Sequence, residues 1–385
     1  MPDRHLLILR DVLVPRVLVS DPRSFGGRLD GSCLRGDLHA DGARVRLHIS
    51  AASDAPRLVI PALVEPHCHL DKCHSIARMV DVGGDLSQAL ARQRQDKLNW
   101  TEADLIARAT RGLNEAAAAG CFALRTHVDW GDPAAPPLAW SVLNGLKQDS
   151  PLNVHCAALT SVEHMADPAY CDAVAGHVAQ ANGALGAFIH GQPDIAPAIA
   201  NMFDAATRFG LPLDFHVDET LEPLSGLEAI ADAAIACGFE GPVLCGHAVA
   251  LINDEGDALA RLLGKLRRAR ITVCALPTTN LYLQGRVAGT PERRGLTRLR
   301  ELRAAGVPVI VGSDNVGDAF CPLGQHDPMA ALSLTVLAAH LDPPFEQWLS
   351  MVTTDAAAAI GIPREAPVFE SPTRTTAELA AGATN

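Results

Sequence analysis

The sequence predicts an α/β fold, a (β/α)8 barrel of the TIM type with a small β appendage. From residue 58 onward, short apolar segments alternate with longer segments rich in Ala, Leu and Arg. This alternation is typical of a parallel sheet connected by crossover helices. Eight such units can be counted, the number that closes a barrel. A doubly wound open sheet is the weaker alternative, because neither a GxGxxG motif nor a P-loop follows the first strand.

The strands are expected at short apolar runs, and the helices at the longer segments between them. Thr101 is the expected N-cap of one helix. Glycines 120, 210, 238 and 306 stand where helices should end before the next strand. The expected strands are Leu58–Val64, Cys121–Val128, Leu152–Leu159, Ala184–Ile189, Leu211–Phe215, Pro242–Cys245, Ile271–Ala275 and Val307–Val311. The expected helices include Thr101–Ala119, Ile195–Phe209, Gly226–Cys237, Asp254–Ala269 and Leu296–Ala304.

Residues 1–57 form the expected appendage, because β-like runs at Leu6–Val14 and Arg44–Ile49 are separated by turn residues. Residues 58–362 would form the barrel, and residues 363–385 a C-terminal tail.

Composition narrows the function classes. The formal net charge of −12 argues against a nucleic-acid partner. No apolar stretch is long enough for a membrane span, and the N-terminus lacks the apolar core of a signal peptide. The ten cysteines include no CxxC pair, which favours reduced thiols in a cytoplasmic protein. Composition leaves the choice between a monomer and a homo-oligomer open.

The segment PALVEPHCHLDK contains the strongest chemical signal. If the strand continues through it, His67 and His69 lie on one face. Two neighbouring imidazoles suit a first-row divalent metal, although a histidine-bearing turn is the alternative. Polar residues at the other expected strand ends favour the metal, because those ends meet only in a barrel. They are Asp71, Lys72, His127, Asp129, His190, His216, Glu219, His247, Asp314 and Asn315.

These residues divide into chemical roles. His67, His69, His216 and Asp314 would hold one metal and leave room for water. Glu219 would act as general acid and base, and His247 would orient the substrate or the water. The alternatives are a solvated loop acid and a core histidine. A bridged two-metal site is disfavoured, since none of the four lysines ends the fourth strand.

From about Leu58 to Gly361, the chain resembles the amidohydrolase superfamily, in particular its cytosine deaminase-like branch, which includes N-isopropylammelide hydrolase. The resemblance rests on VEPHCHLDK, RTHVD, HVDE, the GH at His247, NLYLQGR with ERRGLTRLREL, and SDNVGDAFCPLG. It implies one divalent metal per chain, Zn²⁺ or Fe²⁺, and hydrolysis of a C–N bond in an amidine-like ring. By position it implies the four ligands named above, Glu219 as proton shuttle and His247 as partner of water and substrate. Asp314 would also accept a proton from the water.

Departures from cytosine deaminases bear on the substrate. Ser161 stands where they carry a glutamine, Asn315 replaces a second aspartate, and Phe320 replaces a tryptophan. A serine cannot make the two-point amide contact of a glutamine, so cytosine itself is disfavoured. The expected substrate-binding residues are Lys72, His127, Ser161, Asn315 and Phe320. The resemblance also implies a β-sandwich built from both termini, with residues 367–370 as a remnant of its C-terminal part.

Three functions follow from these observations. The leading prediction is a metal-dependent deaminase or aminohydrolase that acts on a small N-heterocycle, itself the expected partner molecule. The second is a cyclic-amide hydrolase that opens a ring with the same chemistry. The third is a non-catalytic barrel that binds a small ligand, against which the retention of Glu219 counts.

Overall fold

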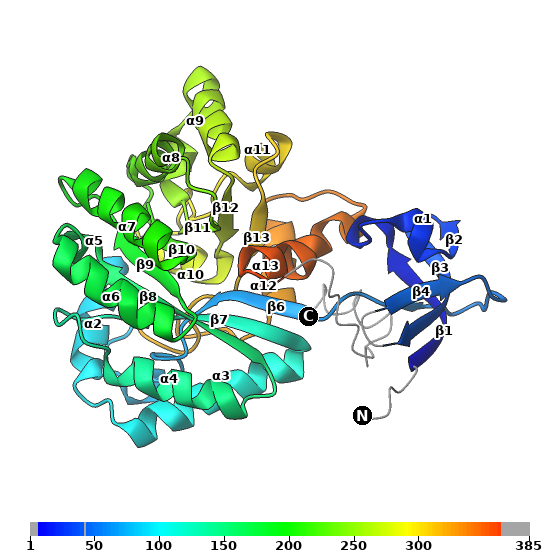
Figure 1. Cartoon of the computed structure of the whole chain (residues 1–385), viewed down its shortest axis with the longest axis horizontal. Coiled ribbons are helices and arrows are strands. Elements are labelled where there is room, and N and C mark those ends of the chain that lie inside the picture. Colours follow the sequence, from blue (N-terminus) through cyan, green and yellow to red (C-terminus); the bar gives the residue numbers. More distant parts are fainter. Residues whose placement is uncertain (1–6, 42–43, 363–385) are drawn as a thin grey trace.

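The computed structural model describes residues 7–41 and 44–362, and an eight-stranded parallel sheet forms its centre (Figure 1). Neighbouring strands in the sheet are also neighbours in the chain, as in a barrel wound in one direction. The strands are β6 (Leu63–Cys68), β7 (Cys121–Asp129), β8 (Asn153–Ser161), β9 (Ala184–Ile189), β10 (Leu213–Val217), β11 (Val243–His247), β12 (Ile271–Ala275) and β13 (Val309–Val311).

Helices connect the strands and cover the outside of the sheet (Figure 1). They are α2 (Leu86–Lys97), α3 (Glu102–Ala119), α4 (Leu138–Asp149), α5 (Val162–Met165), α6 (Pro168–Gln180), α7 (Ile195–Phe209), α8 (Gly226–Cys237), α9 (Gly256–Arg268), α10 (Pro277–Leu283), α11 (Leu299–Ala304), α12 (Pro328–Ala338) and α13 (Thr354–Ala359). Three-residue-per-turn helices span Ile76–Arg78, Val249–Asn253 and Phe345–Val352. Across the described ranges, no helix has both the length and the apolar character needed to cross a membrane.

The predicted fold class is confirmed, and several elements have the predicted bounds, namely β9, β12, α7 and α8. The Thr101 hydroxyl accepts a hydrogen bond from the amide of Asp104 at 3.2 Å, as expected of an N-cap. The predicted strand Leu58–Val64 is wrong. Its first residue, Leu58, belongs to β5 (Arg57–Leu58) in a second sheet, and only its last two residues lie in β6, which begins at Leu63. Pro61 has no amide hydrogen for a ladder, and it lies in the crossing between the two sheets.

Barrel closure between β6 and β13 is made by few backbone contacts. The pair shares an isolated bridge between Cys68 and Asp314, and the amide of Asp314 donates to the carbonyl of His67 at 2.9 Å. The buried carboxylate of Glu65 completes the seam. It accepts hydrogen bonds from the amide of Ser313 at 3.1 Å and from the Ser313 hydroxyl. A side chain therefore replaces part of the ladder that two longer strands would have formed.

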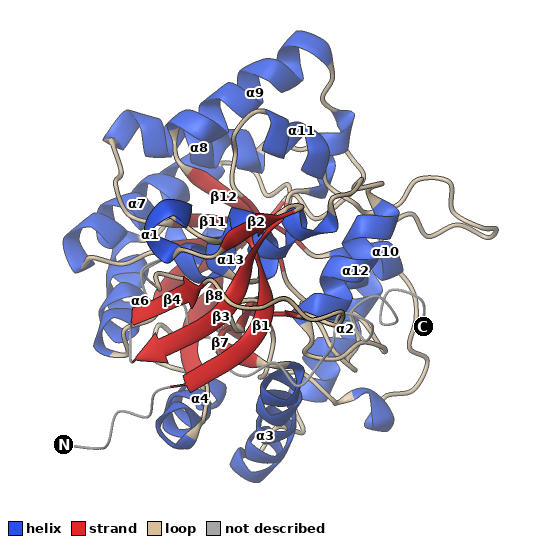
Figure 2. Cartoon of the chain, turned by 90° about the vertical axis from the view of Figure 1, so that its right-hand side faces the viewer, coloured by secondary structure: helices blue, strands red, loops and turns tan. Residues whose placement is uncertain are grey.

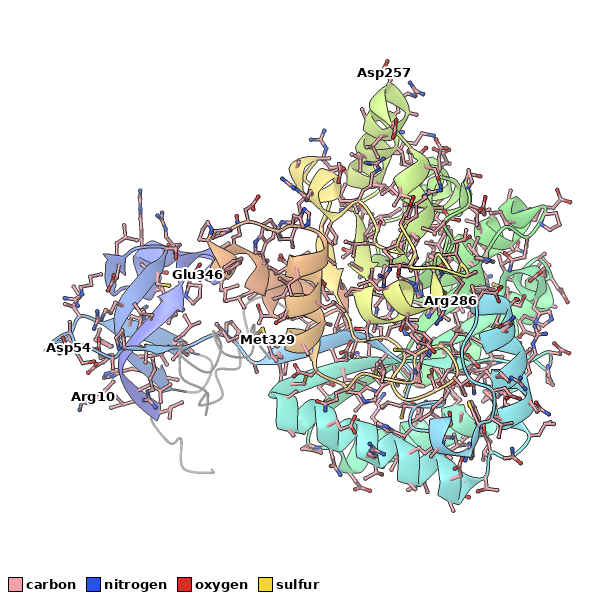
Figure 3. The ribbon with its side chains drawn as sticks, turned by 180° about the vertical axis from the view of Figure 1, so that it is seen from behind. Arg10, Asp54, Asp257, Arg286, Met329 and Glu346 are labelled. Carbon is pink, nitrogen blue, oxygen red and sulfur yellow. The ribbon has the colours of Figure 1, made fainter. Side chains whose placement is uncertain are left out.

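The appendage is a separate sheet beside the barrel (Figure 2). Its order is β2 (Arg28–Asp30), β3 (Cys33–Asp41), β1 (Leu7–Pro15) and β5, and β4 (Arg44–His48) also pairs with β3. A short helix, α1 (Pro22–Phe25), and a turn of helix at Arg16–Leu18 complete it. Figure 3 shows Arg10 on this sheet, Asp54 on the loop between β4 and β5, and Glu346 at the side of the barrel nearest to the sheet. The expected sandwich contribution of residues 363–385 lies outside the described residues.

Gly186 on β9 tests how tightly the barrel is packed. An added Cβ would lie 2.6 Å from the Ala158 carbonyl oxygen and even closer to that of Asp214. Because both neighbours are backbone atoms of adjacent strands, neither can move aside cheaply. We expect Gly186→Ala to lower the free energy of unfolding by about 3 kcal/mol or more. Urea denaturation followed by circular dichroism measures this change.

Gly264→Ala is the matched control, because Gly264 is an exposed residue of α9 with open space around its Cβ position. This variant should gain up to about 1 kcal/mol, the helix propensity difference between Gly and Ala. Equal stability of the two variants would contradict the packing argument.

Candidate active site

Five polar side chains from distant parts of the sequence meet at the carboxyl ends of the barrel strands. His67 lies on β6, His216 on β10 and His247 at the end of β11, while His69 directly follows β6 and Asp314 is the third residue after β13. All five are buried, with at most 4% of each residue exposed. Buried polar side chains at the carboxyl ends of barrel strands are typical of an active site.

Short distances join the four predicted ligands in pairs, with His67 and His69 each in contact with both His216 and Asp314. Nε2 of His216 is 3.1 Å from Nε2 of His67 and 3.2 Å from Nε2 of His69. Oδ1 of Asp314 is 3.5 Å and 3.2 Å from the same two nitrogens. A metal about 2.1 Å from each donor would place tetrahedral neighbours about 3.4 Å apart. The geometry of the donor set therefore fits a single first-row divalent ion.

Hydrogen bonds alone do not explain why these four side chains lie together in the interior. Both carboxylate oxygens of Asp314 are buried without a hydrogen-bond partner among the described residues. Three Nε2 atoms converge, although each neutral imidazole carries only one proton. A buried carboxylate without partners is costly, and a cation between the donors would remove that cost. The residues present thus fit the divalent metal predicted from the sequence.

Left-handed backbone turns occur at three of the strand ends. The φ angles are 53° at Asp218, 68° at His247 and 63° at Asp314, values uncommon for residues other than glycine. Asp218 stabilises its turn by accepting hydrogen bonds from the amides of Gly226 and Leu227 at the start of α8, at 3.1 and 2.9 Å. The turn keeps the next residue, Glu219, buried at the end of β10.

Glu219 and His247 share a hydrogen-bond donor, Asn280 on α10. The Asn280 amide nitrogen lies 3.2 Å from Oε1 of Glu219 and 3.0 Å from Nδ1 of His247. With that amide donating to both, Nδ1 of His247 is the acceptor and Nε2 carries the ring proton. Burial raises the pKa of Glu219 well above its ordinary value, and burial lowers the pKa of His247 to about 4. A protonated carboxyl beside a neutral imidazole suits proton transfer near neutral pH.

His127 lies among the histidines of the donor set, because its ligand atom and those of His67, His69 and His216 all lie within 4.8 Å of one another. Its ring is fully buried, with its centroid 4.0 Å from that of His67. Its Nε2 is 3.0 Å from the buried carboxylate of Asp214, which also accepts a hydrogen bond from Arg125 at 2.9 Å. The predicted role of His127 in substrate binding stays a prediction, and its position favours support of the His67 ring.

Lys72 is buried beside the donor set. Its Nζ is 2.6 Å from Oδ1 of Asp129 and lies over the ring of Phe320, 5.5 Å from the centroid. Burial opposes the charged form of Lys72, but Asp129 and Asp71 outweigh burial, so that its pKa is raised. The ammonium is therefore charged at neutral pH, and it is held between an acid and an aromatic face.

The other predicted substrate residues lie on the loop after β13 and at the end of β8. The Asn315 amide donates to Asp318 at 2.8 Å, and Asp318 accepts from the amides of Phe320 and Cys321. Burial raises the pKa of Asp318 to about 7. Ser161, at the end of β8, donates to Glu163 instead of facing the donor set. The structure thus gathers Asn315 and Phe320 around Asp318 and ties Ser161 into a local contact.

Sequence reasoning missed several residues that shape this site. Asn280 lies inside the NLYLQGR segment, but nothing in that segment marks its amide as the partner of two residues on other strands. Asp318 lies in SDNVGDAF and Glu65 in VEPH, so both were within motifs whose other residues were chosen. Asp214 and Arg125 alternate with the chosen histidines on β10 and β7, and a period of two could have found them.

A scan of family models matches residues 154–366 to one described as the amidohydrolase family. A pterin deaminase from Rhizobium rhizogenes (strain K84) is 32% identical over 377 residues, which span 94% of this chain and 85% of that protein. The family match covers the barrel from β8 onward, and the match to the relative covers nearly the whole chain.

Solved structures agree with these findings. A 5-methylcytosine deaminase from Klebsiella pneumoniae with bound 5-fluorocytosine superposes with a TM-score of 0.75 at 25% identity, over 88% of this chain and 87% of that one. An N-isopropylammelide isopropylaminohydrolase from Burkholderia multivorans gives a TM-score of 0.71 at 21% identity, over 98% and 94% of the two chains. The second similarity concerns the fold alone.

The donor set predicts how the protein responds to loss of a ligand. We expect His216→Asn to lose one equivalent of bound divalent metal, because this ring contacts both other histidines. Metal content after desalting, measured by mass spectrometry, checks the loss. Saturating Zn²⁺, at about a thousand times its dissociation constant, should stabilise the wild-type protein by about 4 kcal/mol over the chelated form.

His190→Asn is the matched control, because His190 also follows a barrel strand but lies outside the donor set. It should keep the metal content of the wild-type protein. Full metal content in His216→Asn would contradict the assignment of the ligands.

Proposed function

Because the chain belongs to the amidohydrolase family and is a metal-dependent hydrolase of carbon–nitrogen bonds, we propose that it deaminates a pterin-type ring. The observation that carries the chemistry is the buried Glu219–Asn280–His247 group beside the set of three histidines and Asp314. The observation that favours a pterin is the identity of 32% with a pterin deaminase along 94% of the chain. Water would add to the ring carbon that carries the amino group, and ammonia would leave.

His67, His69, His216 and Asp314 would hold one Zn²⁺ or Fe²⁺ ion. When bound, such an ion lowers the pKa of water so that hydroxide is accessible near neutral pH. Asp314, with both carboxylate oxygens buried and free of hydrogen bonds, can accept a proton on the side away from the histidines.

Glu219 would move protons between the attacking water and the leaving nitrogen. Asn280 holds one of its oxygens, and Gln284 donates to its backbone carbonyl at 2.9 Å, so the side chain is fixed in place. The Nε2 proton of His247 is available to stabilise negative charge on the oxygen that is added to the ring. Each of these groups acts from a defined position, which is the main requirement for general acid and base catalysis.

Lys72 and Phe320 would recognise the ring. The Lys72 ammonium can donate to a ring carbonyl oxygen, and the face of Phe320 can pack against a flat heterocycle. Asn315 would help to position Phe320 through its hydrogen bond to Asp318. His127 would help to position His67 through the contact between their rings. A bicyclic ring offers more contact area than cytosine does, which compensates for the missing glutamine at Ser161.

The same metal chemistry could open a cyclic amide instead. The strand-end residues do not separate the two outcomes, but release of ammonia with the ring intact does. The composition supports a cytoplasmic enzyme that acts on a diffusible small molecule without a nucleic-acid partner. Assembly as a homo-oligomer is compatible with this function.

We expect the purified, metal-loaded protein to release ammonia from pterin, and Glu219→Gln to lower kcat by about 10²- to 10⁴-fold. The amide keeps the shape of the carboxyl group but cannot carry a proton between water and nitrogen. A coupled ammonia assay measures turnover, and metal analysis checks that the variant keeps the wild-type metal content.

Glu222→Gln is the matched control, because Glu222 is an exposed acid three residues further along the same loop. It should keep wild-type turnover. Turnover of 5-methylcytosine or N-isopropylammelide in place of pterin would redirect the substrate assignment. Full activity of Glu219→Gln would remove its proposed role, and binding without turnover of any ring would favour the non-catalytic alternative.

Lys72→Met should raise KM for pterin by about 10- to 100-fold with a smaller effect on kcat, the loss expected for one charged hydrogen bond. Steady-state kinetics with metal-loaded protein separates the two constants. Lys97→Met is the matched control, because Lys97 lies 3.8 Å from the same carboxylate, Asp129, but its side chain is 37% exposed, whereas that of Lys72 is buried. A change in kcat alone for Lys72→Met would place Lys72 in the chemical step rather than in recognition.

A further inference from the structure

A second group of potential metal ligands lies outside the donor set of the active site. It contains His74, Glu115 and His326, whose ligand atoms all lie within 4.8 Å of one another. His74 follows β6 by six residues, Glu115 is on α3, and His326 immediately precedes Asp327, the N-cap of α12. The three residues therefore join two active-site loops to a helix of the outer layer.

One carboxylate oxygen is shared by both rings. Oε2 of Glu115 lies 3.1 Å from Nε2 of His74 and 3.2 Å from Nδ1 of His326. The ring centroids are 5.7 Å apart, at an interplanar angle of 66°. Both histidine side chains are buried, whereas the Glu115 side chain is 23% exposed and leaves a route from solvent.

Hydrogen bonding accounts for only one of these two contacts. His326 has the geometry of a hydrogen bond to Oε2, but the buried Nε2 of His74 has no hydrogen-bond partner among the described residues despite its short distance to that oxygen. The Nε2 atom of His74 is thus close to the carboxylate oxygen, but the ring does not point at that oxygen. The His74 ring could instead point at an ion that lies about 2.1 Å from each donor atom. Donor atoms around such an ion would be about 3.1 to 3.4 Å apart.

Two neighbouring residues on α3 help to hold Glu115 and His326 in this arrangement. Gly112 lies one helical turn before Glu115, and a Cβ there would come within 2.9 Å of the His326 ring. Arg111 donates to the other oxygen of Glu115 at 3.1 Å and thereby leaves Oε2 to the histidines. The charge of Arg111 opposes a cation, but its side chain is 66% exposed, so solvent screens it.

We propose that His74, Glu115 and His326 form a second, structural site for a first-row divalent cation such as Zn²⁺. Two imidazoles and one carboxylate supply three ligands, and water reaches the fourth position past the partly exposed Glu115. A cation at this site would stabilise the loops and would take no part in the reaction.

Its position gives the cation a structural role. The amide of His74 donates to the carbonyl of Val316 at 2.9 Å, and that of Ile76 donates to Gly317 at 2.9 Å. These bonds tie the loop after β6, which carries His69 and Lys72, to the loop after β13, which carries Asp314 and Phe320. A cation held by His74 and His326 would fasten the same two loops from outside.

The test uses chelator-treated full-length protein loaded with Zn²⁺ and desalted, with zinc measured by mass spectrometry. We expect two equivalents in the wild-type protein, and one in His326→Gln and in His74→Gln. His216→Asn should also retain one, and the double variant of His216 and His326 none. Co²⁺ absorption of His216→Asn would then report the second site alone, and Zn²⁺ should raise the melting temperature of this variant but not of the double variant.

His164→Gln is the matched control, because His164 also lies beside an acid, Asp132 at 3.3 Å, but has no third ligand within the described part of the chain. It should keep two equivalents. One equivalent in the wild-type protein, or two in His326→Gln, would overturn the proposal and leave the three residues as an ion-pair cluster. If circular dichroism shows that a histidine variant is unfolded, Glu115→Gln gives the same readout. None of these measurements depends on pterin turnover, so the two proposals can fail separately.

Discussion

The site depends on closure of the barrel between its first and last strands. Cys68 and Asp314 form one isolated bridge there, and the carboxylate of Glu65 holds Ser313 in place of further ladder bonds. His67 lies on one side of this seam and Asp314 on the other. A shift of about 1 Å between the strands would separate the carboxylate from the imidazoles, and such shifts are large on the scale of catalytic geometry. Glu65 is therefore as important for the donor set as the ligands themselves.

Buried charges beneath and beside the donor set are paired with one another. Arg125 and His127 surround Asp214, and Lys72 lies against Asp129. Leaving any of these groups unpaired would cost several kcal/mol, so each pair fixes the positions of its members. Pairing also sets the protonation states that the chemistry needs. Burial and the nearby Asp314 raise the pKa of Glu219 more than Lys72 lowers it, so the Glu219 carboxyl retains a proton while Lys72 remains charged.

The fold and the grouping of the donor residues could be predicted because both depend on local patterns. Alternation along β6 places His67 and His69 together, and the strand ends of a barrel bring His216 and Asp314 to them. The error at the first strand arose because one apolar run serves two sheets, and only Pro61 marks the division. Asn280 and Asp318 could not be predicted, since their side-chain directions depend on how α10 and the loop after β13 pack, and no periodicity encodes that packing.

The agreement between strand order and chain order has a consequence for biosynthesis. Each strand that emerges from the ribosome pairs with the strand made just before it, so the sheet grows as an open ribbon with two unpaired edges. The edge of β6 stays without its second neighbour until residues 309–314 have been made. Unfinished chains therefore carry the histidines of the site together with an exposed strand edge, and they are the form of this protein most prone to aggregate. Late completion of the seam makes the final strands decisive for both solubility and activity.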